Sequence, residues 1–197
     1  MRLAALLAAT ALAACASPTG LDAAGRFDSF EAQGTPDFSA YEAVYIAPVT
    51  FSDELRARIG YRPRGPQDRT RPLSESDLEG RAEDLAEAMT DEFAKVARLV
   101  DAPGPGVLTV EAVLTALEAN RPTMAELQAT PSLDFNSISV GDAGAQVTLR
   151  DGDRVIAVIE DNAFRRNLND PTVGVGIWTT SRTYYDRLAD KLASLLA

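Results

Sequence analysis

The chain has 197 residues, a formal net charge of −10 at pH 7, one cysteine and no histidine. This acidic balance argues against binding nucleic acid through a general electrostatic field, and one cysteine excludes an internal disulfide. Without histidine, Ser-His-Asp and Cys-His catalysis and ordinary zinc sites are excluded as well.

The N-terminus has the pattern of a bacterial lipoprotein signal. Arg2 supplies a positive charge, residues 3–11 are apolar, and residues 12–15 (LAAC) match a lipobox. We therefore expect cleavage before Cys15, covalent lipid on this cysteine and no other cofactor. The apolar run is shorter than the roughly 20 residues of a membrane span. An ordinary secretory signal with an incidental cysteine, or a buried N-terminal helix, is the alternative.

The residue after the cysteine bears on the location of the protein. An aspartate there typically retains lipoproteins in the inner membrane of enteric bacteria, whereas this chain has Ala16. We therefore expect a lipid anchor in the outer membrane, on its periplasmic face. The predicted organisation is a signal peptide at 1–14, a lipidated N-terminus and tether at 15–40, and a single α+β domain at 41–197.

The first half of the predicted domain contains a strand and a helix. Residues 41–49 are rich in aromatic and β-branched side chains and predict a strand. Glycine and proline forbid a regular element over residues 52–72. A capping box at residues 76–79, with Ser74 as a second candidate cap, begins a helix that extends to about Arg98. Its apolar stripe has helical spacing and consists of Leu78, Ala82, Leu85, Met89, Phe93 and Val96.

The second half adds three strands and a helix. Residues 107–117 alternate as a strand, and residues 120–134 are loop-like with one helical turn. Residues 145–159 contain an Asp-Gly pair between two alternating runs and predict a hairpin. The last helix begins near Thr180 or Ser181. The order strand, helix, strand, strand, strand, helix predicts a small, largely antiparallel or mixed sheet with two helices on one face.

Residues 52–72, which we call the arginine loop, reverse the local charge. Guanidinium groups suit phosphates and carboxylates, so the loop is a candidate contact for lipid phosphates, lipopolysaccharide, or acidic wall or protein groups. The alternative is a solvated loop whose arginines pair with the acidic helix at residues 77–92. Six arginines lie within 16 residues here: Arg56, Arg58, Arg62, Arg64, Arg69 and Arg71.

Three other patterns are weaker. Asp151-Gly152-Asp153, with Glu160 and Asp161, could gather oxygen ligands for calcium, but the spacing of a calcium loop is missing, so no metal site is predicted. Asp142 and Asp161 could act as a carboxylate pair, but acidic residues are abundant, so no catalytic residue is predicted. Residues 174–176 (GVG) precede a helix and could bind an anion, although a flexible loop is the default for a lone G-x-G.

Four segments together carry a resemblance: YEAVYIAPV, PLSESDLEGRAEDL, GPGVLTVEAVLTALEANRP and ISVGDAGAQVTLRDGDRVIAVIEDN. They are similar to the family of unknown function 3313 (DUF3313), whose members are bacterial lipoproteins with a similar lipobox. The resemblance covers residues 26–197 and is most specific at 141–152, although the turn at 151–153 is shorter than the Asp-x-x-Thr-Gly type of that family. The resemblance implies a cellular location and a fold, but no activity.

The predicted function is that of a lipid-anchored, non-enzymatic cell-envelope lipoprotein, a binding or scaffold module facing the periplasm. Its expected partners are the membrane, through the anchor, and an envelope protein or anionic component. The alternative is a lipid- or apolar-ligand-handling accessory of an envelope transport system, with the loop at 120–140 beside a cavity. A hydrolase that uses carboxylates is a weaker third option. A roomy pocket lined by Leu, Val and Phe would favour ligand handling, and a closed core with an exposed arginine-bearing or apolar patch would favour the binding module.

Overall fold

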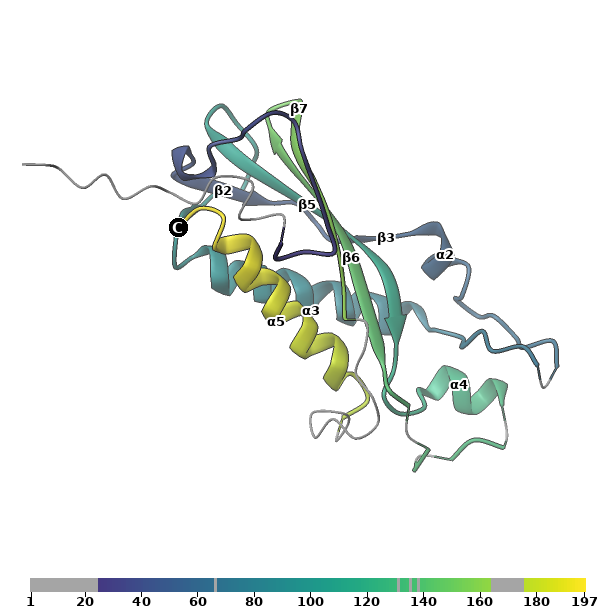
Figure 1. The fold of residues 1–197 in the computed structure, drawn as a ribbon. Helices are drawn as coiled ribbons and strands as arrows, with labels where there is room; N and C mark the ends of the chain where they lie inside the picture. The colour runs from purple at the N-terminus through teal and green to yellow at the C-terminus, as the bar shows by residue number, and fades with distance from the viewer. Residues whose placement is uncertain (1–24, 66, 131, 135, 138, 164–175) are drawn as a thin grey trace, which may run out of the picture.

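The computed structural model describes residues 25–65, 67–130, 132–134, 136–137, 139–163 and 176–197. Within these residues, seven strands form one mixed sheet in the order β1-β7-β6-β5-β2-β4, with β3 also paired to β5 (Figure 1). The fold is therefore α+β, as predicted. The strands are β1 (Ser29–Ala32), β2 (Ala43–Ile46), β3 (Thr50–Phe51), β4 (Arg98–Leu99), β5 (Val107–Glu118), β6 (Asp142–Asp151) and β7 (Arg154–Asn162). The helical elements are the 3-10 turn η1 (Phe38–Ala40), α2 (Asp53–Arg56), α3 (Glu75–Phe93), α4 (Met124–Ala129) and α5 (Thr179–Ala193).

The centre of the sheet is an antiparallel meander of β5, β6 and β7. Strands β2 and β3 pair with β5 in parallel, and β1 pairs antiparallel with β7 at one edge. In the predicted β6–β7 hairpin Asp151 pairs with Arg154, so the two turn residues are Gly152 and Asp153, one position later than the Asp-Gly pair. Gly152 has φ +57°, which glycine adopts without strain.

Helices α3 and α5 lie side by side and cover one face of the sheet (Figure 1). The side chains of Leu85, Met89 and Phe93 on α3 are fully buried, and so are those of Leu188 and Leu192 on α5. Each fully buried side chain of this size contributes about 1.5–3 kcal/mol relative to an exposed one. The predicted alternation on β5 is confirmed, since its buried face consists of Leu108, Val110, Ala112 and Leu114.

The ends of the two long helices differ from the prediction. The N-cap of α3 is Ser74: its hydroxyl accepts a 3.1 Å hydrogen bond from the Asp77 amide, and the Asp77 carboxylate accepts from the Ser74 amide at 2.9 Å. The helix ends at Phe93, so Val96 falls outside it and is 40% exposed. Helix α5 begins at Thr179, without a side-chain cap.

The predicted tether extends too far along the chain. Residues 25–40 belong to the folded domain, because β1 pairs with β7 and the side chains of Phe27 and Phe38 are buried. The ring of Phe30 lies 6.0 Å from that of Phe27 and 6.4 Å from that of Phe38. These aromatic side chains supply the apolar burial that orders the segment.

Cys15 and the predicted signal lie outside the described residues. In the part of the chain that the structure describes, no helix combines the length and apolarity needed to cross a membrane.

Candidate binding site

Two of the six arginines in the arginine loop are structural. The Nε atom of Arg58 donates to the carbonyl oxygen of Arg71 at 2.8 Å, and its Nη1 atom donates to that of Leu117 at 2.8 Å. The Nη2 atom of Arg58 lies 3.1 Å from a carboxylate oxygen of Glu118. Arg58 therefore ties the loop to the end of β5.

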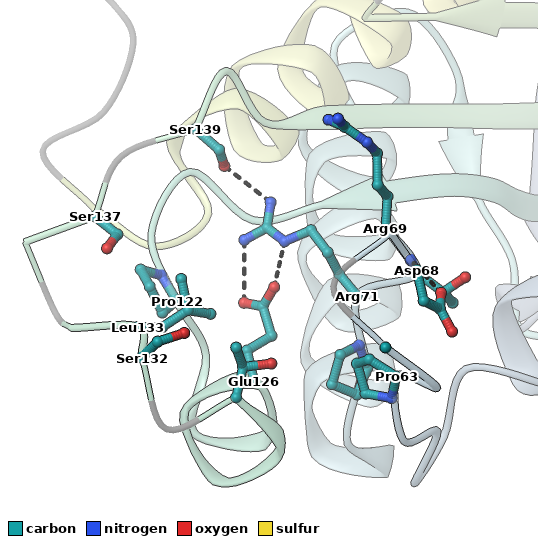
Figure 2. Close-up of a pocket in the computed structure, with 14 residues that line it drawn as sticks. Pro63, Asp68, Arg69, Arg71, Pro122, Glu126, Ser132, Leu133, Ser137 and Ser139 are labelled. Carbon is teal, nitrogen blue, oxygen red and sulfur yellow. Dashed lines mark hydrogen bonds and ion pairs between the residues drawn. The ribbon is translucent and has the colours of Figure 1, made fainter.

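Arg71 makes the second set of contacts (Figure 2). Its Nε and Nη2 atoms both donate to the carboxylate of Glu126 on α4, with a distance of 3.0 Å for Nη2. Its Nη1 atom donates at 2.8 Å to the carbonyl oxygen of Ala119 and to the hydroxyl of Ser139. The same atom lies 3.3 Å from Glu118. We call Arg58, Arg71, Glu118 and Glu126 the ion-pair frame.

The two carboxylates of the frame lie in different surroundings. Glu126 is 2% exposed, and besides the bidentate arginine it accepts a 2.8 Å hydrogen bond from the amide of Thr123, in the capping box of α4. Burial raises the pKa of Glu118 above its ordinary value, while Arg58 and Arg71 act in the opposite direction. A buried carboxylate needs such partners, because unpaired burial of a charge is costly.

The other four arginines lie at the surface. Arg56 ends α2, a regular element where none was expected over residues 52–72, because the glycines and prolines of this segment begin only at Gly60. The guanidinium of Arg56 is 5.4 Å from the centre of the Phe51 ring. Arg62, Arg64 and Arg69 are exposed, and none of their guanidinium groups forms an ion pair with a residue of the described ranges. Figure 2 shows the Arg69 side chain pointing away from the pair of Arg71 with Glu126. The loop thus presents four cations to solvent, and Arg56 among them lies against the Phe51 ring.

The acidic helix does not pair with the arginine loop. On α3, Asp84 lies 2.9 Å from Arg81 and 3.2 Å from Arg182, and Glu92 lies 2.6 Å from Lys95. The ion pairs expected of a simple solvated loop are therefore absent between α3 and the loop, as far as both are described.

Asp68 organises the tip of the loop. Its carboxylate accepts hydrogen bonds from the hydroxyl of Tyr61 at 2.6 Å, from the Arg64 amide at 2.9 Å and from the Thr70 amide at 3.0 Å. These hydrogen bonds hold the pKa of the Asp68 carboxyl well below its usual range. The hydrogen bonds to Asp68 therefore fix the backbone conformation around Arg64 and Arg69.

A pocket of about 500 Å³ lies between the arginine loop and the segment from Pro122 to Ser139 (Figure 2). Arg71 and Glu126 of the ion-pair frame line this pocket, and so does Arg69 of the arginine loop. Prolines, hydroxyl side chains and charged groups line it, together with Leu133. Apolar atoms supply most of the exposed surface of this lining, and its charged groups are two acidic and two basic side chains, so the lining suits a ligand that carries both apolar and polar groups.

The sequence reasoning missed the carboxylates that divide the loop into structural and exposed arginines. The helical turn expected within residues 120–134 is α4, but its capping box, Thr123-x-x-Glu126, does not predict pairing with Arg71, 55 residues away. Nothing in the sequence distinguishes Glu118 from the other acidic residues.

Asp142 and Asp161 do not form a carboxylate pair. Asp161 is buried, and both of its carboxylate oxygens accept hydrogen bonds from Lys191 of α5, at 2.9 and 3.0 Å. Asp142 lies on the other face of the sheet, since Ala143, the next residue of β6, packs into the core. Burial raises the pKa of Asp142 above its ordinary value.

The other two weak patterns gain no support. Asp151 pairs with Arg154 at 3.0 Å, at the opposite end of the β6–β7 hairpin from Asp161. The described residues contain no group of three or more acidic or cysteine side chains placed to hold a metal ion. Residues 174–175 of the G-x-G pattern lie outside the described residues, and the Gly176 amide donates to the hydroxyl of Thr179 at 3.0 Å.

The structure is thus that of an α+β domain with an arginine loop braced on its sheet. The chain belongs to the family described as "Protein of unknown function (DUF3313)", whose model matches residues 32–190. No curated protein matches the sequence significantly. Among solved structures, a dodecamer of a PelC variant from Paraburkholderia phytofirmans is similar, with 8% sequence identity, a TM-score of 0.44, and coverage of 83% of this chain and 95% of that one.

Proposed function

We propose that this protein is a lipid-anchored, non-enzymatic module of the cell envelope that binds an anionic partner through Arg62, Arg64 and Arg69. The observation that carries the proposal is the division of the arginine loop. Two arginines are committed to the ion-pair frame, while these three are exposed without an ion pair among the described residues. Guanidinium groups that are not already paired are available to phosphate or carboxylate.

The ion-pair frame also favours binding. It ties the loop to the end of β5 through Arg58 and to α4 through Arg71. A loop held in one position loses little conformational freedom when a partner binds, so more of the interaction energy appears as affinity.

The apolar-ligand alternative has one observation in its favour. The segment from Pro122 to Ser139 borders a pocket, and apolar atoms supply most of the exposed surface of its lining. However, Leu133 is the one Leu, Val or Phe side chain among the described lining residues, and the helix-covered face of the sheet is a packed core. The exposed arginines are the more specific feature, because guanidinium groups bind phosphate or carboxylate.

The anchor is proposed from the sequence. Cleavage before Cys15 and acylation of this residue would hold the domain to a membrane, and Ala16 favours the periplasmic face of the outer membrane. We expect Cys15→Ser to remain unprocessed or to leave the membrane fraction. If the variant is processed and fractionates with the outer membrane as the parent does, the lipoprotein assignment is wrong.

The partner is tested by pull-down from solubilised envelopes at low and high salt. We expect the triple variant Arg62→Gln, Arg64→Gln, Arg69→Gln to fold like the parent and to lose partners that the parent recovers. Recovery by the parent should weaken as salt rises, because exposed charges are screened. The matched control is Arg98→Gln, Arg154→Gln, Arg187→Gln, which changes the net charge equally at exposed positions elsewhere. Equal recovery by both variants and the parent would contradict the proposal.

A further inference from the structure

The large exposed apolar side chains are unevenly distributed. In the described part of the chain they are Ile59, Val96, Met124 and Ile177, with exposed fractions of 38%, 40%, 61% and 42%. Ile59 lies in the arginine loop, Met124 begins α4, and Ile177 precedes α5. These three lie at one end of the molecule, whereas Val96 follows the other end of α3. Scattered apolar residues need no explanation, but a gathering beside unpaired cations does.

Helix α4 joins the apolar and the cationic groups. Its residues Ala125 and Gln128 border two grooves. Met124 and Ile177 line the first groove, of about 340 Å³. Arg62 lines the second, of about 490 Å³. Met124 and Ile177 on one hand, and Arg62 of the arginine loop on the other, therefore line neighbouring grooves that meet at Ala125 and Gln128.

This surface lies far from the point where the described chain begins. The guanidinium of Arg26 donates to the hydroxyl of Ser194 at 2.6 Å, and the Lys191 amine lies 5.4 Å from the centre of the Phe27 ring. Both contacts are at the C-terminal end of α5, while Ile177 stands just before its N-terminal end. The 15 residues of α5 separate the two by about 22 Å at 1.5 Å per residue. Figure 1 likewise shows α4 and the C-terminus at opposite ends of the molecule.

We propose that Met124, Ile177, Arg62, Arg64 and Arg69, together called the α4 surface, dock a protein segment that carries carboxylates beside apolar side chains. This inference rests on the proposed function and names the partner. A small anion, or a polyanion without apolar groups, would leave the side chains of Met124 and Ile177 uncovered. Methionine and arginine are enriched in protein interfaces, where apolar contacts lie within a polar rim.

The anchoring membrane is the other candidate partner of the α4 surface. The described chain begins at the end of the domain where Arg26 meets Ser194, opposite the α4 surface, so an anchor at Cys15 would attach at that opposite end. We therefore take a protein of the periplasm as the partner, and a lipid contact is an outcome of the test below. Charge complementarity favours an acidic segment, because the exposed arginines of this surface have no carboxylate of their own among the described residues.

Site-specific photocrosslinking in intact cells tests the inference. A photoreactive phenylalanine analogue replaces Met124 in one variant and Val96, the matched control, in another. We expect one discrete protein adduct from position 124, absent from position 96 and lost when Arg62, Arg64 and Arg69 are changed to Gln. Mass spectrometry of the adduct should identify a segment with both acidic and apolar residues. A lipid adduct, no adduct at position 124 or the same adduct from position 96 would overturn the inference.

The identified segment, made as a synthetic peptide, separates this inference from the proposed function. By calorimetry, we expect Met124→Gln, Ile177→Gln to bind it at least tenfold more weakly than the parent, and Val96→Gln to bind it equally. If the arginine variant loses binding while the Met124 and Ile177 variant binds like the parent, the apolar contact is refuted and the anionic contact stands. If the arginine variant binds like the parent, the proposed function itself fails.

Discussion

Breaking the ion-pair frame should destabilise the whole domain. In Arg71→Met the buried carboxylate of Glu126 loses both arginine donors, and the carbonyl oxygen of Ala119 and the hydroxyl of Ser139 lose one each. Removing one member of a buried pair costs about 3–5 kcal/mol. Because the Arg71 side chain is 25% exposed, water can partly replace it, and we expect the low end, about 3 kcal/mol. At roughly 2–4 °C per kcal/mol, the melting temperature should fall by about 6–12 °C.

Urea denaturation measures the effect, because urea does not screen charges as guanidinium chloride does. The control is Arg69→Met, which removes an exposed arginine of the same loop and should change the free energy of unfolding by less than about 0.5 kcal/mol. The double variant Arg71→Met, Glu126→Leu leaves no unpaired buried charge at this pair and should be more stable than Arg71→Met alone. If Arg71→Met and Arg69→Met unfold at the same urea concentration, the frame does not stabilise the fold.

Three further predictions concern the core, one turn and one titrating group. Phe93→Ala should cost about 3–5 kcal/mol in urea denaturation, since this ring is fully buried, while Val96→Ala should cost less than about 0.5 kcal/mol; equal curves would show that α3 does not pack as described. Gly141→Ala should lower the free energy of unfolding more than Gly34→Ala. Both glycines have positive φ, where an alanine costs about 1–2 kcal/mol. Only at Gly141 would the added Cβ also clash, because it would lie 2.6 Å from the side-chain nitrogen of Asn120. Burial raises the pKa of Asp142 in the folded state, so the parent loses stability as pH rises through that pKa. Asp142→Asn should therefore be more stable than the parent at pH 7 in urea denaturation, and the difference should vanish near pH 3; a difference independent of pH would exclude titration of Asp142 as its cause.

The sequence alone predicted the elements that depend on local patterns. The stripe of Leu85, Met89 and Phe93, the alternation of β5 and the hairpin near Asp151 follow from side-chain periods and turn preferences, which act over a few residues. The family resemblance, carried by the same segments, is confirmed over residues 32–190. Cys15 and its lipid remain predictions from the sequence.

Boundaries and short elements needed tertiary context. Residues 29–32 are too few for a clear alternation, and they form β1 because β7 offers a free edge and Phe27 and Phe38 find places in the core. Ser74 and Ser76 both stand three residues before a carboxylate, and the structure places the N-cap at Ser74, paired with Asp77. Helix α3 ends at Phe93, although Ala97 and Leu99 beyond it also pack against the core, and Val96, between Phe93 and Ala97, is exposed.

The roles of the six arginines were decided by tertiary structure alone. Arg58 and Arg62 are chemically identical and lie four residues apart in a segment rich in glycine and proline. Only the topology brings the end of β5 to Arg58 and the capping box of α4 to Arg71. Glu118 and Glu126 therefore pair with these two arginines, and Arg56, Arg62, Arg64 and Arg69 are left exposed. Composition predicts how many cations a segment carries. An ion pair depends on distance in space, and Arg71 and Glu126 lie 55 positions apart in the sequence.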